Sequence, residues 1–318
     1  MTTRISSLTS TPVSTTAISA SAISTASVSI PPISSTVKDY WMLLKPRVMS
    51  LVIFTGFVGL YLAPGTIHPF LGFTTLLCIA VGAGASGALN MWYEHKTDAL
   101  MERTKARPIP SGRIDPDEAL SFGAFLAAGA IFVLGLTVNW TAAGLLAATI
   151  CFYIFVYTHF LKHSTPQNIV IGGAAGAFPP VIGWAAIATP MAWEPFFLFL
   201  IIFLWTPPHF WSLALLCKED YKKAGIPMMP NTHGEAATKK QIFVYTWLLV
   251  AGSLLPLLTS AQGLLYGIGA SVLGFGFILY AWKLLRATEK KAAKTLFLYS
   301  IAYLFILFGL MVVDRFLG

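Results

Sequence analysis

Nine separate runs of apolar residues dominate this chain, and each is long enough to cross a lipid bilayer. A membrane-spanning helix needs about 20 mainly apolar residues. The runs lie at about 46–64, 70–91, 118–138, 141–160, 168–188, 194–216, 242–260, 264–283 and 295–313. With 56% hydrophobic residues and a mean hydropathy of +0.72, the chain is predicted to be an all-α integral membrane protein with nine transmembrane helices.

The basic residues predict how the chain is oriented in the membrane. Counted loop by loop, 20 of the 21 Lys and Arg residues fall on one side of the membrane, and only Arg315 falls on the other. Cytoplasmic loops carry the excess of Lys and Arg. We therefore expect a cytoplasmic N-terminus and a periplasmic C-terminus. The net charge of +8 reflects this topology and does not indicate nucleic-acid binding.

The first 36 residues differ in composition from the rest of the chain. They contain 19 Ser and Thr and a single charged residue, Arg4. Such a segment lacks the apolar residues needed for a core, so residues 1–36 are predicted to be a disordered tail and 37–318 a single membrane domain. A mitochondrial presequence would be richer in Arg. The inner membrane of a bacterium is therefore favoured over that of a mitochondrion.

A cluster of polar residues follows the second apolar run. Asn90, Glu94 and Asp98 are spaced by four, so they share one face if the helix continues past Leu89. Two carboxylates and an amide are oxygen ligands that suit Mg²⁺, which typically bridges carboxylates to substrate phosphates. The sequence therefore predicts a magnesium site here, although a solvated loop with incidental ion pairs would also fit.

A second acidic pair, Glu219 and Asp220, follows the sixth apolar run on the same predicted side. Together the two clusters resemble two halves of one site that binds a metal and a phosphate. The predicted metal ligands are Asn90, Glu94, Asp98, Glu219 and Asp220. Nearby cations could bind phosphate oxygens. These candidates are Arg103, Arg107, Lys162 and, less strongly, Lys222. The substrate of such a site would have a polyanionic head at the membrane surface and an apolar tail within the membrane. A prenyl diphosphate has both.

Paired prolines and small residues predict the helix packing. Pro179-Pro180 and Pro207-Pro208 lie in neighbouring predicted spans. Proline kinks a helix, and kinked helices at membrane depth are tolerated around a cavity. Gly172 belongs to a stretch of small residues spaced by four, which lets helices approach closely. We therefore expect closely packed helices that bend around a cavity.

These motifs resemble those of the intramembrane aromatic prenyltransferase superfamily, and in particular its haem branch. The resemblance covers about 38–315. It rests on four stretches, LLKPR (43–47), NMWYEHKTDALMERTKARPIPSG (90–112), YTHFLKHSTPQNIVIGGAAGAFPPVIGW (157–184) and WTPPHFW…EDYKKAGIPMMP (205–230). The family pattern usually has Asp where this chain has Glu94.

The resemblance implies a nine-helix bundle around a central lipid-open cavity that is capped by cytoplasmic loops. It also implies a magnesium-dependent transfer of the farnesyl group of farnesyl diphosphate to the 2-vinyl group of haem b. Water is added and diphosphate is released, giving haem O for haem–copper oxidases. Asn168, within the third stretch, is implied in substrate binding. A haem A synthase or an oxidase assembly factor would be the partner that receives the product.

His209 is the one histidine deep inside a predicted span, directly after Pro207-Pro208, whereas His159 lies at a membrane edge. An ionisable residue at membrane depth is a functional candidate, so His209 is predicted to bind the haem. A hydrogen bond between helices is the structural alternative, and His159 is the next candidate ligand.

Two other functions share parts of this pattern. A related prenyltransferase could act on a quinone or chlorin precursor with the same metal chemistry. A non-catalytic membrane transporter is the second alternative, although transporters usually place acidic residues near the bilayer midplane.

Overall fold

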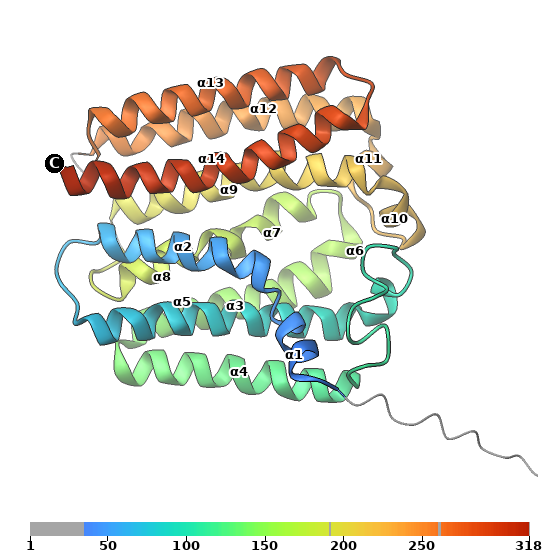
Figure 1. Ribbon diagram of the computed structural model, residues 1–318, viewed down its shortest axis with the longest axis horizontal. Coiled ribbons are helices and arrows are strands. Elements are labelled where there is room, and N and C mark those ends of the chain that lie inside the picture. The colour runs from blue at the N-terminus through green and yellow to red at the C-terminus, as the bar shows by residue number, and fades with distance from the viewer. Residues whose placement is uncertain (1–34, 191, 260–261, 318) are drawn as a thin grey trace, which may run out of the picture. The chain divides into compact units, whose positions relative to one another are not determined.

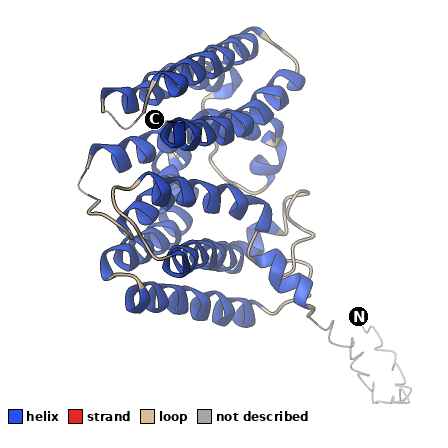
Figure 2. Cartoon of the chain, turned by 60° about the vertical axis from the view of Figure 1, so that its left-hand side comes forward, coloured by secondary structure: helices blue, strands red, loops and turns tan. Residues whose placement is uncertain are grey.

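The computed structural model describes residues 35–190, 192–259 and 262–317. Of the predicted tail, only its last two residues lie within these ranges. Every regular element in the described residues is a helix (Figure 2). The elements are α1 (Val37–Leu43), α2 (Pro46–Leu62), α3 (Pro69–Asp98), α4 (Pro116–Thr137), α5 (Trp140–Cys151), η1 (Phe152–Leu161), α6 (Lys162–Ser164), α7 (Asn168–Ala177), α8 (Pro179–Ala185), α9 (Trp193–Leu216), α10 (Lys218–Lys223), α11 (Met229–Thr232), α12 (Gly234–Leu254), η2 (Leu255–Leu258), α13 (Leu264–Arg286) and α14 (Lys290–Leu317).

The predicted membrane helices correspond to helices of the structure. Eight helical segments of the described chain are long and apolar enough to span a bilayer on their own. The helix α2 meets the same criterion only together with α1, from which it is bent by 53°. The all-helical membrane fold predicted from the apolar runs is therefore confirmed, with eight to nine spans in the described residues.

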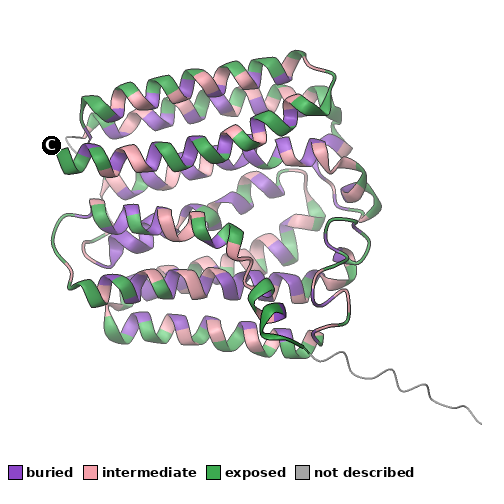
Figure 3. Ribbon diagram, in the orientation of Figure 1, coloured by how far each residue is buried: buried purple, intermediate pink, exposed green. Residues whose placement is uncertain are grey.

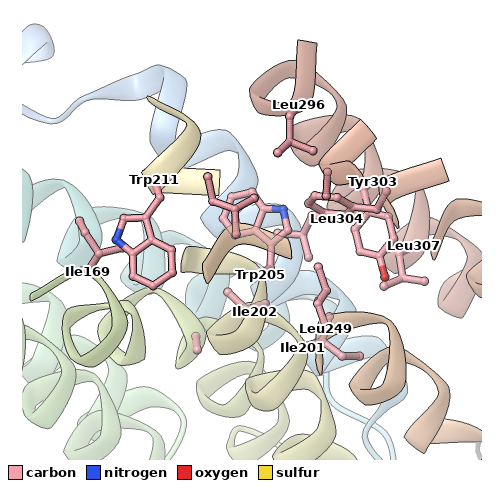
Figure 4. Packing of buried hydrophobic residues seen from close by; sticks show 14 of the residues in the cluster. Ile169, Ile201, Ile202, Trp205, Trp211, Leu249, Leu296, Tyr303, Leu304 and Leu307 are labelled. Atoms are coloured by element: carbon pink, nitrogen blue, oxygen red, sulfur yellow. The ribbon is translucent and has the colours of Figure 1, made fainter. Parts of the chain in front are cut away.

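The long helices lie side by side in a bundle, and short helices and loops join them at its ends (Figure 1). One buried cluster of side chains joins α3, α4, α5 and α8. A larger one joins α7 and α9 to α12, α13 and α14. Figure 4 shows Trp211 of α9 beside Ile169 of α7, and Trp205 of α9 on the side of Leu304 and Tyr303 of α14. Exposed residues follow the outer faces of the bundle (Figure 3), as expected for helices that face lipid.

The two proline pairs have different effects on their helices. Pro179 and Pro180 separate α7 from α8, where they occupy the first turn of α8. A proline is tolerated there because its missing N–H would have had no partner. Pro207 and Pro208 lie inside α9, which continues through them. The helices α2 and α8 approach so closely that a Cβ added at Gly59 would overlap the backbone of Pro180.

The segment η1 is a π-helix of ten residues, Phe152–Leu161. A π-helix bonds residue i to i+5, is rare, and is often found at functional sites. The Thr158 hydroxyl donates to the backbone carbonyl of Tyr153, five residues earlier, at 2.8 Å. A Cβ added at Gly172 on α7 would overlap the ring of Tyr157. Close packing at Gly172, predicted from its spacing, is therefore what lets α7 lie against η1.

Candidate active site

Asn90, Glu94 and Asp98 lie on one face of the last turns of α3, as their spacing predicts. The helix continues without a break to Asp98, and all three side chains are buried. Glu94 is 2% exposed and Asp98 is 1% exposed. Carboxylates this far from water require cations or hydrogen-bond donors nearby. The alternative of a solvated loop is therefore inconsistent with the geometry.

Each of the three residues is held by a cation from another part of the chain. Lys162, directly after η1, places its Nζ 2.5 Å from the carboxylate of Glu94. Arg107 donates from a guanidinium nitrogen to Asp98 Oδ2 at 2.6 Å. Lys45 donates its Nζ to Asn90 Oδ1 at 2.7 Å. The predicted phosphate-binding residues Lys162 and Arg107 thus lie beside the predicted metal ligands.

Hydrogen bonds from η1 and the loop after α3 complete the cluster. The amide nitrogen of Asn90 donates to the Thr158 hydroxyl at 3.2 Å. The Thr104 hydroxyl donates to the backbone carbonyl of Asp98 at 2.8 Å, which holds the loop against the end of α3. Asp98 Oδ1 is buried and has no hydrogen-bond partner among the described residues. A buried carboxylate oxygen without a donor is a position that a bound cation or a water molecule could satisfy.

Asn168, at the start of α7, positions the loop that carries Lys162. Its side-chain nitrogen donates to the backbone carbonyl of Thr165 at 2.7 Å and to that of Lys162 at 3.4 Å. The side chain is fully buried. These contacts give Asn168 a role in holding Lys162 in place, and its buried Oδ1 lacks a partner in the described chain.

The second predicted acidic pair is more loosely held. Asp220, on α10, accepts a hydrogen bond from the backbone N–H of Arg103 at 3.4 Å, which joins α10 to the loop after α3. Glu219 and Lys222 are exposed. Burial raises the pKa of the neighbouring Tyr221 hydroxyl, so this group stays protonated at neutral pH. In the described residues, no three His, Cys, Asp or Glu side chains are arranged to hold a metal ion.

His209 makes a contact between helices. Its Nδ1 lies 2.7 Å from the Ser300 hydroxyl of α14. Its ring stacks between Trp205 and Phe297, with ring centres 4.2 Å and 4.7 Å away. This is the geometry of the structural alternative, a hydrogen bond between α9 and α14. His159 is exposed, and its Nδ1 lies 2.7 Å from the Tyr93 hydroxyl.

Three contributions to the site do not follow from the sequence pattern. The pattern marks Lys45 only as a charge that sets topology, yet it is a partner of Asn90 and has a left-handed backbone with φ of 52°. The π-helix places Thr158 against Asn90, and no local sequence pattern predicts a π-helix. Arg113 donates to Asp39 of α1 at 2.7 Å and so ties α1 to the loop after α3. The stretch LLKPR is the one signal that could have indicated Lys45.

The comparisons with known proteins identify the class to which this fold and site belong. The model of the UbiA prenyltransferase family matches residues 52–308, so the chain belongs to that family. Membership of a prenyltransferase family argues against the transporter alternative.

Individual relatives are more specific. The chain is 57% identical, over 284 residues, to a protoheme IX farnesyltransferase of Rhizobium meliloti, covering 88% of this chain and 90% of that protein. It is 56% identical to one from Parvibaculum lavamentivorans, covering 89% and 90%.

Solved structures show the same fold at low sequence identity. A digeranylgeranylglyceryl phosphate synthase is similar with a TM-score of 0.73 and 21% identity, covering 88% of this chain and 99% of that one. A UbiA homologue from Archaeoglobus fulgidus, bound to GPP and Mg²⁺, is similar with a TM-score of 0.58 and 16% identity, covering 86% and 99%.

Proposed function

We propose that the chain transfers the farnesyl group of farnesyl diphosphate to the 2-vinyl group of haem b and thereby makes haem O. The bond between farnesyl C1 and the diphosphate oxygen breaks, and diphosphate leaves with the electron pair. A carbon–carbon bond forms between C1 and the terminal vinyl carbon. Water adds to the cation left on the porphyrin side chain and releases a proton, which leaves a hydroxyl group.

The observation that carries this proposal is the identity of 57% to a relative with this named activity, spread over 88% of the chain. The buried cluster on α3 supplies the chemistry that the reaction requires. Nothing in the contacts described above favours a quinone or chlorin acceptor over haem.

The charges of the cluster suit a diphosphate. The two buried carboxylates of Glu94 and Asp98 face three cations, Lys45, Lys162 and Arg107. An arginine binds phosphate oxygens in a fixed fork, whereas a lysine acts as a mobile point charge. Charge grows on the diphosphate as the C1–O bond breaks, so cations already in position stabilise the transition state more than the ground state.

The α3 cluster also fits a magnesium ion. Asn90, Glu94 and Asp98 would hold it. Asp220 of α10, which accepts from the backbone N–H of Arg103, would be the further ligand, whereas Glu219 is exposed. The buried, unpartnered Oδ1 of Asp98 is the observation in favour of this assignment. When bound, Mg²⁺ would neutralise charge on the leaving diphosphate. Lys162 and Arg107 would remain beside it to contact the phosphate oxygens.

The π-helix offers aromatic side chains to the allylic carbon. The rings of Tyr153 and Tyr157 lie 5.3 Å apart in η1, next to Thr158, which contacts Asn90. Aromatic faces attract cations. A water-poor cavity beside them would protect the farnesyl cation until the vinyl carbon attacks.

The proposed setting is the inner membrane of a bacterium, with the N-terminus cytoplasmic and the C-terminus periplasmic. The 20 Lys and Arg residues on one side of the membrane support this orientation. A haem A synthase or an oxidase assembly factor is the proposed recipient of haem O, because the product is too apolar to leave the membrane freely.

The experiment is a reaction of the purified protein in detergent with haem b, farnesyl diphosphate and Mg²⁺, analysed by mass spectrometry of the pigment. We expect the mass of haem b plus one farnesyl group and one hydroxyl group, and release of diphosphate. Geranyl and geranylgeranyl diphosphate, and a quinone precursor in place of haem, serve as competing substrates. Transfer to the quinone precursor and not to haem b would contradict the proposal.

A further inference from the structure

A second group of charged residues lies outside the candidate active site, where α13 ends and α14 begins. It contains five cations and one carboxylate, Lys283, Arg286, Lys290, Lys291, Lys294 and Glu289. The proposed reaction uses none of them. The loop lies at the same end of the bundle as the start of α12, because Lys239 donates to the backbone carbonyl of Ala287 at 2.8 Å.

Part of this group lines a groove of about 460 Å³ between the two helices. The lining side chains include Tyr280, Lys283, Arg286, Glu289, Lys291 and Thr295. This volume is within the range of about 300–1,000 Å³ that is usual for small-ligand sites. In the described part of the chain, none of the three lining cations forms an ion pair. The groove therefore carries a net positive charge, with three cations against the one carboxylate of Glu289.

Aromatic rings support two of these cations. The guanidinium of Arg286 lies 4.0 Å from the centre of the Trp282 ring, and Lys283 Nζ lies 5.5 Å from that of Tyr280. Tryptophan and tyrosine are enriched where a membrane meets water, because one part of the ring is apolar and another is polar. The groove is thus placed at the level of the lipid headgroups.

An apolar surface continues from the groove along α13. Going back along α13 from Trp282, an exposed apolar side chain recurs every three or four residues. These side chains are Leu279, Phe275, Val272 and Ile268. This spacing places them on one face of the helix. A ligand held in the groove by its charged part would meet this face with its apolar part.

We propose that the groove binds the headgroup of an anionic phospholipid. Lys283, Arg286 and Lys291 contact the phosphate, and the acyl chains lie along the exposed face of α13. Basic pockets between transmembrane helices at the cytoplasmic side suit such headgroups, and each Lys or Arg near the surface strengthens the attraction. This site is separate from the proposed farnesyl transfer and does not depend on it.

The test is native mass spectrometry of the full-length protein in detergent, titrated with phosphatidylglycerol or phosphatidylcholine. The variant K283Q/R286Q/K291Q removes the three lining cations. The matched control K38Q/R47Q/K240Q removes two lysines and an arginine that are also exposed and lie outside the groove. We expect the parent and the control to bind phosphatidylglycerol more tightly than phosphatidylcholine. In the groove variant, the affinity for phosphatidylglycerol should fall by at least about tenfold.

Equal binding of phosphatidylglycerol by the groove variant and the control would overturn the proposal. So would displacement of phosphatidylglycerol by inorganic phosphate at equal concentration, which would indicate a site for free phosphate. If the triple variant does not fold, as judged by its thermal unfolding, R286Q alone is measured. For R286Q we expect the affinity for phosphatidylglycerol to fall about fivefold. An unchanged affinity would count against the lipid site.

Discussion

The end of α3 buries its carboxylates, whereas α10 leaves its own closer to water. Glu94 and Asp98 each lie against a cation at 2.5–2.6 Å. Glu219 is exposed, and the Asp220 side chain accepts, within the described residues, a single hydrogen bond from a backbone N–H at 3.4 Å. A charge in a low-dielectric environment interacts several times more strongly than one in water. The comparison shows that buried ion pairs already fix the α3 carboxylates, whereas contacts among the described residues hold those of α10 only weakly.

The largest effect should come from Asp98. We expect Asp98→Asn to reduce farnesyl transfer by about a thousandfold or more, because it removes the charged partner of Arg107 and a proposed metal ligand. The measurement is the single-turnover rate with haem b in excess. Thermal unfolding of the purified variant serves as the control for folding. A loss of only about twofold would remove Asp98 from the catalytic site.

A smaller loss is expected for Arg107→Lys. The lysine keeps the charge near Asp98 but loses the forked contact with phosphate, which should cost about tenfold to a hundredfold. The apparent affinity for farnesyl diphosphate should account for part of it. The control is Lys105→Arg, because Lys105 is exposed and pairs with Glu102. Kinetics of Arg107→Lys equal to those of the parent would place Arg107 outside the diphosphate site.

Substitutions of the two acidic residues of α10 should have different effects on the rate of farnesyl transfer. Asp220→Asn is expected to lower the rate by about a hundredfold, because Asp220 is linked to the loop that carries Arg103. Glu219→Gln should stay within about twofold, since an exposed charge interacts weakly. Both rates are measured over a Mg²⁺ titration. If both variants lost as much activity as Asp98→Asn, the two clusters would act as equal halves of one site.

The smallest effect is expected for Glu94→Asp. This change keeps the charge and restores the residue that the family pattern usually has, while the flexible side chain of Lys162 can follow the shorter carboxylate. The rate should stay within about threefold of the parent's. Glu94→Gln, measured in parallel, removes the charge at nearly constant size. It should be far slower, and equal rates for the two variants would show that the charge is not required.

Local patterns predicted the α3 face, and tertiary contacts decided the rest of the site. The spacing of Asn90, Glu94 and Asp98 follows from the period of a helix, so it could be read directly from the sequence. The pairing of Glu94 with Lys162 spans 68 residues and depends on the register of η1. From the sequence, Lys45 could not be distinguished from the basic residues that only set the orientation in the membrane. Its contact with Asn90 arises only when α2 packs beside α3.

His209 illustrates the same limit from the opposite direction. A histidine inside an apolar run is unusual enough to indicate function. Its partner Ser300 is 91 residues away, however, and nothing near either residue announces the hydrogen bond. Ligation of haem by His209 stays a prediction. In His209→Ala, a loss of thermal stability with an unchanged haem spectrum would agree with a contact that only joins α9 to α14.

The π-helix η1 makes the active site sensitive to the length of the chain. An α-helix has 3.6 residues per turn, so each residue added or removed rotates the downstream part of the helix by about 100°. If the same ten residues of η1 formed an ordinary α-helix, each would turn the chain by about 100°, more than in the wider π-helix, so the end of η1 would be rotated relative to α3. Thr158 and Lys162 would then turn away from Asn90 and Glu94. The wide turns of η1 therefore lower the local stability of the helix but bring η1 and α3 together in the correct register.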